Sequence, residues 1–101
     1  MDFEWDSEKR ETNIEKHGVD FVQAARILTR EHLLLPARTV GGENRWKAVG
    51  TLRPAEARPE NWSGALAVVV FTVRGDVIRI ISARRASSYE RRRYESELGG
   101  A

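Results

Sequence analysis

Four short segments of this chain have the apolar patterns of β-strands, and in the second and fourth of them side chains alternate between two faces, as in strands that bury one face of a sheet. The third segment is almost wholly apolar and is therefore expected at the centre of the sheet, and the fourth is short and β-branched. Turns at Gly41-Gly42 and at Arg74-Gly75-Asp76 favour an antiparallel meander. The four predicted strands span residues 32–36, 45–52, 65–73 and 77–82.

A first helix is predicted ahead of these strands. It is expected to begin at Asp6 or Ser7 and to end near His17, because Gly18 can adopt the left-handed conformation that stops a helix. Ile14 is the only clear core residue, so the helix is poorly amphipathic. One polar face follows from spacings of four, seven and eight residues, and it comprises Lys9, Asn13, Lys16 and His17.

Two further helices are predicted by capping boxes, one formed by Asp20 with Gln23 and one by Ser87 with Glu90. Residues 3–5 form either a short first strand or an anchoring segment, and residues 53–64 lack periodicity and predict an exposed hairpin loop. The elements together predict one α+β domain spanning residues 1–101. It contains an antiparallel sheet of about four strands, two N-terminal helices and one C-terminal helix. The apolar stripe of the second helix comprises Phe21, Ala24, Ala25 and Leu28.

Charge is distributed unevenly along the chain, although the overall net charge is only +2. Residues 74–94 contain seven arginines and two acidic residues, a net charge of +5. Residues 1–43 contain six basic and nine acidic residues, a net charge of −3. Arginine binds phosphate through two parallel hydrogen bonds, so the basic segment favours a polyanionic partner.

Several classes of protein are disfavoured by composition. The chain has no cysteine, which excludes disulfides and thiolate zinc sites, and its two histidines do not favour a structural metal. The N-terminal residues lack the apolar run of a signal peptide, and the longest apolar run, 65–71, is too short to span a bilayer. We therefore expect a cytoplasmic protein without a cofactor, a metal or a membrane partner.

Three segments together resemble a known family. They read FEWDSEK followed by NIEKHGVDF, then GENRWKAVG, then VRGDVIRIISARRAS followed by ERRRYE. In this order, over nearly the whole chain, they are similar to BrnT-type toxins, which are small ribonucleases with a RelE-like fold. The resemblance implies an endoribonuclease neutralised by a cognate BrnA-like antitoxin. It also implies a hetero-oligomer of the two proteins that binds operator DNA through the antitoxin complex.

The chain departs from that family at two places. The family commonly has a D-H-S-like stretch before its G-E-x-R, and here Arg38, Thr39 and Val40 stand at those positions, which removes a possible active-site histidine. The loop at residues 53–64 is also longer than usual. These departures keep a second function open, namely a non-catalytic module that binds nucleic acid or an antitoxin. A third hypothesis is an interaction domain whose basic face holds an acidic protein.

Metal-free RNA cleavage requires cations that stabilise the charged phosphorane. Arg45, Arg79 and Arg84 are the catalytic candidates for this role, since they fall in the segments that resemble the family. The alternative for Arg79 is an ion pair on the face of its strand. Arg79 and Arg84 lie on opposite faces of a straight strand, so they converge only if the strand bends or ends near Ser82.

Proton transfer requires a base, and His17 and Glu43 are the catalytic candidates. Their alternatives are a helix C-terminal histidine favoured by the helix dipole and a solvated glutamate. Arg92 follows Tyr89 by three residues and is the preferred member of its arginine run, whereas Trp46 and Tyr94 are expected in the core. The RNA-binding candidates are Lys16, Lys47, Arg85, Tyr89 and Arg92.

Overall fold

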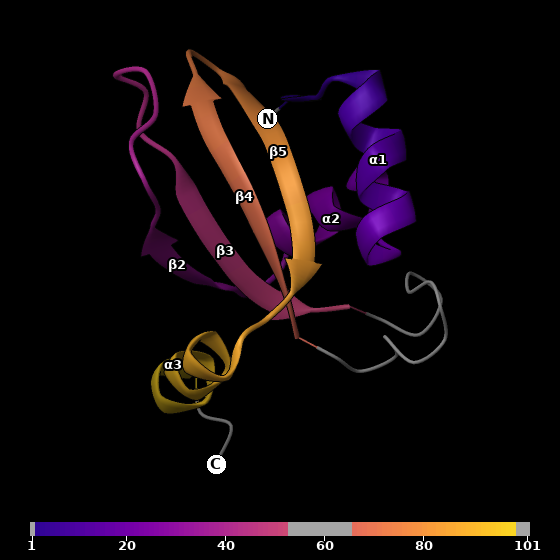
Figure 1. The fold of residues 1–101 in the computed structure, drawn as a ribbon. Coiled ribbons are helices and arrows are strands. Elements are labelled where there is room, and N and C mark those ends of the chain that lie inside the picture. The colour runs from indigo at the N-terminus through magenta and orange to yellow at the C-terminus, as the bar shows by residue number, and fades with distance from the viewer. Residues whose placement is uncertain (1, 53–65, 99–101) are drawn as a thin grey trace.

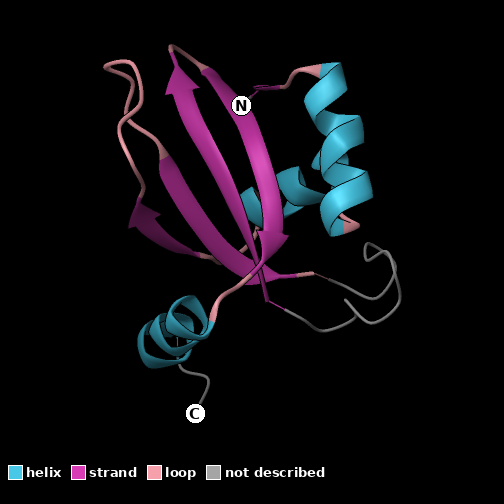
Figure 2. Cartoon of the chain, in the orientation of Figure 1, coloured by secondary structure: helices cyan, strands magenta, loops and turns pink. Residues whose placement is uncertain are grey.

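The computed structural model describes residues 2–52 and 66–98, which form a five-stranded sheet and three helices (Figure 1, Figure 2). The loop prediction for residues 53–64 lies outside the described residues. The other helices and strands agree with the sequence pattern in order and type. They are β1 (Asp2–Glu4), α1 (Ser7–His17), α2 (Phe21–Leu28), β2 (Leu33–Pro36), β3 (Trp46–Thr51), β4 (Leu66–Arg74), β5 (Val77–Arg85) and α3 (Ser88–Leu98).

The sheet has the strand order β1-β5-β4-β3-β2, so the most apolar strand is central, as predicted. The four longer strands pair antiparallel, which confirms the meander. A fifth strand, β1, pairs parallel to the start of β5, so the short first strand considered for residues 3–5 is present and the sheet has one strand more than the predicted four. Three residues are too few to show a period of their own, and β1 forms only because the β5 edge accepts it.

The strand β5 extends to Arg85, three residues beyond the predicted end, and contains a β-bulge. Phe71 pairs with Ile80 and Val70 pairs with Ser82, so Ile81 has no partner on β4. An extra residue of this kind shifts the alternation of all later side chains by one position. The strand therefore changes which of its side chains face each side of the sheet after Ile81.

One face of the sheet, called here the helical face, carries the main core beneath α1 and α2. Phe21 and Ile27 of α2 are buried against apolar side chains of β3, β4 and β5. The Trp5 ring contacts the Phe21 ring edge to face, with centroids 6.2 Å apart. Trp46 packs against the same core, as its position in the alternation predicts. The predicted apolar stripe of α2 is confirmed, since Phe21, Ala24 and Ala25 are buried and Leu28 is partly buried.

The helix α1 lies beside β5 (Figure 1), and its polar face is the one that meets the sheet. The prediction that Ile14 is its core residue is wrong, because Ile14 is exposed and Asn13 is buried. Asn13 Oδ1 accepts from the Ala83 N–H at 3.1 Å, and Asn13 Nδ2 donates to the Val19 carbonyl at 2.9 Å. The β5 edge continues beyond the three residues that pair with β1, and a buried N–H on such an edge needs an acceptor.

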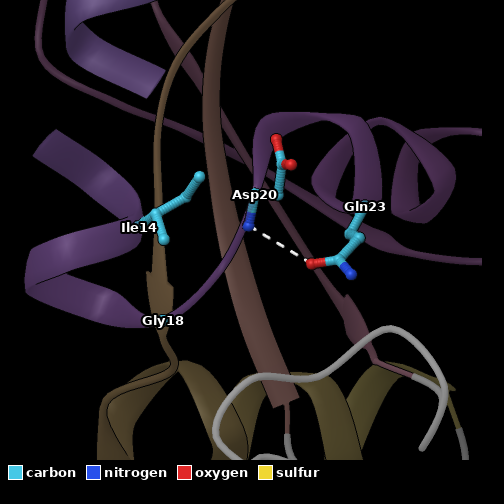
Figure 3. A pocket seen from close by; sticks show the side chains of 4 residues that line it. All are labelled: Ile14, Gly18, Asp20 and Gln23. Atoms are coloured by element: carbon cyan, nitrogen blue, oxygen red, sulfur yellow. Dashed lines mark hydrogen bonds between the residues drawn. The ribbon is translucent and has the colours of Figure 1, made fainter. Parts of the chain in front are cut away.

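The connection between α1 and α2 is held by polar contacts (Figure 3). Gly18 ends α1 with a φ of 73°, and the Asp20–Gln23 capping box begins α2. Arg10 donates to both Asp20 carboxylate oxygens at 2.7 and 2.8 Å, and these hydrogen bonds lower the pKa of Asp20. A pocket in this region is lined by Ile14, Gly18, Asp20 and Gln23 (Figure 3).

The helix α3 follows β5 and covers one end of the opposite sheet face. A second, smaller core lies there, in which Leu35, Val49 and Val68 are buried and Tyr94 packs against them, as expected for Tyr94. The predicted capping box is present, because Ser87 N donates to Glu90 Oε1 at 2.8 Å and Glu90 N donates to Ser87 Oγ at 3.2 Å. Within the described ranges, no helix is long and apolar enough to cross a membrane.

Candidate nucleic-acid interface

The sheet face opposite α1 and α2 carries a cluster of charged side chains, called here the arginine face. The strand register places them there. Arg79 pairs with Thr72, Arg84 with Val68 and Lys47 with Val70. These positions alternate along β3 and β4 with the residues that face the main core, so they point to the other side of the sheet. Five cations and three carboxylates make up the cluster, for a net charge of +2. The members are Arg45, Lys47, Arg74, Arg79 and Arg84, with Glu4, Glu43 and Glu90.

The β-bulge decides that Arg79 and Arg84 lie on the same face. Residues five apart point to opposite faces of a regular strand, but the unpaired Ile81 between them reverses the alternation. From the sequence, Arg79 and Arg84 were expected to converge only if the strand bent or ended near Ser82. The bulge brings them together within a continuous strand. Both arginines are partly buried, with 29% and 35% of their side chains exposed.

Glu90 joins the cationic side chains of two strands to α3. Its carboxylate accepts from Arg84 Nη1 and Nη2, each at 2.8 Å, and from Lys47 Nζ at 3.0 Å. Only 3% of the Glu90 side chain is exposed, while Lys47 and Arg84 remain partly accessible. The Arg84 hydrogen bonds, with those of Ser87 N and Lys47, hold the pKa of Glu90 well below its usual range. Glu90 is therefore a fixed anion that orients Arg84 and Lys47.

Two further carboxylates pair with arginines at the other end of the face. Arg79 Nη1 donates to Glu4 Oε2 at 2.8 Å, so the ion pair considered as an alternative for Arg79 is present. Arg74 donates to Glu43 at 2.8 and 3.3 Å. These hydrogen bonds are the main cause that lowers the pKa of Glu43, and the charges of Arg45 and Arg79 lower it further. Glu43, Arg45 and Arg79 are therefore electrostatic neighbours.

Arg45 differs from the other cations of the arginine face. Among the described residues its side chain forms no ion pair, and its Nε is shielded from solvent without a hydrogen-bond acceptor. A buried donor without a partner costs on the order of 1–3 kcal/mol. Arg45 therefore lies beside Glu43 and Arg79, and its guanidinium has hydrogen-bond donors that no described residue accepts.

The remaining predicted site residues lie elsewhere. Lys16 and His17 belong to the α1 face that meets β5, outside the arginine face. Arg85 pairs with Ala67, a core residue, so its position in the register belongs to the helical face. Tyr89 is exposed on α3 and accepts from Arg93 Nη1 at 2.9 Å. Arg92 is exposed on the same helix.

Sequence reasoning missed two carboxylates of this cluster. Glu4 alternates with Phe3 on β1, and that alternation was the available signal for a residue facing away from the core. Glu90 was recognised only as the partner of Ser87 in the capping box. Its ion pairs with Arg84 and Lys47 depend on how α3 packs against the sheet, which the local sequence does not encode. No group of three or more potential metal ligands occurs in the residues that the structure describes.

Comparison with known proteins agrees with the resemblance seen in the sequence. The family model described as "Ribonuclease toxin, BrnT, of type II toxin-antitoxin system" matches residues 5–90. Among solved structures, the ribonuclease toxin BrnT of Brucella abortus aligns with a TM-score of 0.61 and 28% sequence identity, covering 87% of this chain and 99% of that one. No curated protein sequence matches the chain. The expected family, its α+β fold and the endoribonuclease activity that the family implies are thus confirmed, and the chain belongs to the BrnT family of ribonuclease toxins of type II toxin–antitoxin systems.

Proposed function

We propose that this endoribonuclease cleaves RNA without a metal ion and that the arginine face is its active site. In this reaction the ribose 2′-oxygen loses its proton to a base and attacks the adjacent phosphorus. The bond from phosphorus to the 5′-oxygen of the next nucleotide breaks, that oxygen takes a proton from solvent, and a 2′,3′-cyclic phosphate remains. The five-coordinate phosphorane carries more negative charge than the ground state. Arginines held in a partly buried cluster stabilise such a state more than they stabilise bound RNA, which accelerates the reaction.

The observation that carries the proposal is the convergence of Arg79, Arg84 and Arg45 on one side of the sheet. Arg45 contributes donors that the described protein leaves unused, and the other two contribute guanidinium groups fixed by Glu4 and Glu90. A fixed guanidinium loses little side-chain entropy when phosphate binds. The carboxylates thus pre-orient the cations, and RNA phosphates exchange with them or add to their free donors.

Glu43 is the carboxylate of this face that we propose as proton acceptor for the 2′-OH. Its lowered pKa keeps it ionised near neutral pH, which an acceptor requires, but also makes it a weak base. Electrostatic stabilisation by the arginines therefore carries the larger part of the rate enhancement. His17 lies on α1 and is not needed for this step.

The antitoxin of such a system is proposed to bind the same face. RNA and an acidic protein segment have the same charge, so one surface serves both and occupancy by the antitoxin blocks cleavage. An antitoxin carboxylate would compete with Glu4 and Glu43 for Arg79 and Arg74, because these two carboxylates are more accessible than Glu90. The complex would reach operator DNA through the antitoxin, in line with type II systems in which the two proteins act together.

The test is cleavage of single-stranded RNA by purified protein in the presence of a chelator. Arg79→Ala is the sharpest variant, because its partner Glu4 is 41% exposed and can be hydrated when the arginine is removed. Loss of one preorganised donor to a developing oxyanion is expected to lower kcat by roughly a hundredfold or more. Arg26→Ala on the exposed side of α2 removes the same charge away from the arginine face and should leave kcat unchanged.

Three outcomes would overturn parts of this proposal. Cleavage that requires an added metal would exclude the metal-free mechanism. A folded Arg79→Ala protein with wild-type kcat would exclude the arginine face as the active site. A wild-type protein that binds RNA without cleaving it would favour the non-catalytic module, which the absent D-H-S-like stretch first suggested.

A further inference from the structure

A second cationic site lies between α1 and β5, outside the arginine face. Here a cavity of about 230 Å³ is lined by side chains of α1 and by the two β5 residues at the bulge. Among the described residues that line it, three carry or can carry positive charge, three carry hydroxyl or amide groups, and none is acidic. They are Lys9, Thr12, Asn13, Lys16, His17, Ile81 and Ser82.

The cations of this cavity are unpaired, in contrast to most of those on the arginine face. Within the described residues, the side chains of Lys9, Lys16 and His17 form no ion pair or hydrogen bond. The helix also has glutamates at positions 8, 11 and 15. A rotation of about 100° per residue places Glu11 opposite the cavity and places Glu8 and Glu15 beyond Thr12 at its flank, and none of the three lines it. The segregation concentrates positive charge at the cavity in a region whose overall charge is negative.

The cavity adjoins the arginine face through Ser82. The register places Ser82 opposite Val70, on the same face as Arg79 and Arg84 and between them along β5. Ser82 is also one of the two β5 residues that line the cavity. An RNA strand that crosses the sheet edge at Ser82 would therefore pass from the arginine face to this cavity.

We propose that this cavity is a subsite for a phosphate of the RNA strand that flanks the cleaved linkage. Lys9 and Lys16 would bind the non-bridging phosphate oxygens as point charges, whereas the Thr12 hydroxyl already donates to the Glu8 carbonyl at 3.0 Å. Asn13 is already committed to Ala83 and Val19, so it shapes the cavity without binding the ligand. This inference rests on the proposed ribonuclease function and assigns His17 to binding of the flanking nucleotide, away from the cleavage chemistry.

The experiment compares a Lys9→Ala/Lys16→Ala variant with wild-type protein on two substrates. A dinucleotide has one phosphodiester, which occupies the arginine face alone, whereas a longer single-stranded RNA also fills the subsite. The variant should raise KM for the longer RNA by roughly tenfold or more, because charge-assisted hydrogen bonds are lost. Its kcat on both substrates and its KM for the dinucleotide should stay unchanged.

Direct binding separates this inference from the proposed catalytic site. The probe is a 2′-O-methyl RNA of the longer length, which cannot be cleaved because its 2′-oxygen is blocked. Each lost phosphate contact lowers the slope of log affinity against log salt by about 0.7 for a single strand, so the double variant, which loses one phosphate, should lower it by about 0.7. A Lys9→Arg/Lys16→Arg variant should retain the wild-type slope, and Arg26→Ala serves as the charge-matched control.

Each outcome decides the inference by itself. Wild-type affinity and salt slope in the double alanine variant would overturn the subsite, even if Arg79→Ala abolishes cleavage. A lower slope would support it, even if the wild-type protein proved unable to cleave RNA. Unchanged RNA binding with weakened antitoxin binding would show that the cavity contacts the antitoxin and would also overturn the proposal.

Discussion

Glu90→Gln is the most informative single substitution for the organisation of the arginine face. The change keeps the shape of the side chain but replaces one carboxylate oxygen by an amide NH₂ group and removes the charge. In the wild type, Glu90 Oε1 accepts from Ser87 N and Arg84 Nη1, and Oε2 accepts from Arg84 Nη2 and Lys47 Nζ. If the amide oxygen keeps the first pair, the amide NH₂ meets two cationic donors.

The magnitude follows from these contacts. Two hydrogen bonds to charged groups are lost, each with a typical net contribution of roughly 1.5–3 kcal/mol. Water can replace part of this, because Arg84 is 35% and Lys47 is 23% exposed. We therefore expect Glu90→Gln to lower the free energy of unfolding by about 2–4 kcal/mol at pH 7. This is a large fraction of the roughly 5–15 kcal/mol of an ordinary domain.

The loss should depend on pH in a defined direction. Glu90 has a folded pKa below its ordinary value of 4.5, so its charge stabilises the fold above that pH. The contribution is lost progressively as the pH falls below 4.5 toward the folded pKa. The difference between wild type and Glu90→Gln should thus be full at pH 7 and should shrink below pH 4.5.

Urea unfolding followed by tryptophan fluorescence at several pH values measures this difference. Glu95→Gln, an exposed position on the same helix, removes the same charge and should change stability by less than about 0.5 kcal/mol. A Glu90→Gln protein as stable as the wild type at pH 7 would refute the reasoning. So would a stability loss that stays constant in acid, since it would not come from the charge.

Three further predictions concern side chains that hold the site in place. Asn13→Leu should lower the free energy of unfolding by about 2–4 kcal/mol, because it leaves the Ala83 N–H and the Val19 carbonyl unpaired. Chemical denaturation measures this loss, and the neighbouring substitution Thr12→Val should give a smaller one. Gly50→Ala should cost about 1–3 kcal/mol, since its Cβ would lie 2.7 Å from Ile27 Cγ2. The added cost should be smaller in an Ile27→Ala background, which removes Cγ2, and an equal cost in both backgrounds would contradict the steric explanation. Thr72→Val removes the 2.7 Å hydrogen bond from the buried Thr72 hydroxyl to the Asn44 carbonyl and should lower the free energy of unfolding by about 1–2 kcal/mol. Amide hydrogen exchange around Glu43 and Arg45 should become faster. Exchange at the wild-type rate would show that this bond does not position the two residues.

Local signals in the sequence determined the helices and most of the strands. The capping boxes at Asp20 and Ser87 and the Gly18 stop depend on contacts within a few residues, so the sequence encodes them directly. The alternation in β3 likewise predicted that Trp46 faces the core and that Lys47 faces away from it. The motif segments also identified the family, which the comparisons confirmed.

Long-range packing decided how the site is assembled. The bulge at Ile81 places Arg79 and Arg84 together, and it depends on pairing between two complete strands. The burial of Asn13 in place of Ile14 depends on the free edge of β5, and the role of Glu90 depends on where α3 meets β3 and β5. Periodicity reports which residues share a face of one element, but it carries no information about the partner of that face. The sequence therefore predicted which cations were available, and only the tertiary structure decided which of them converge.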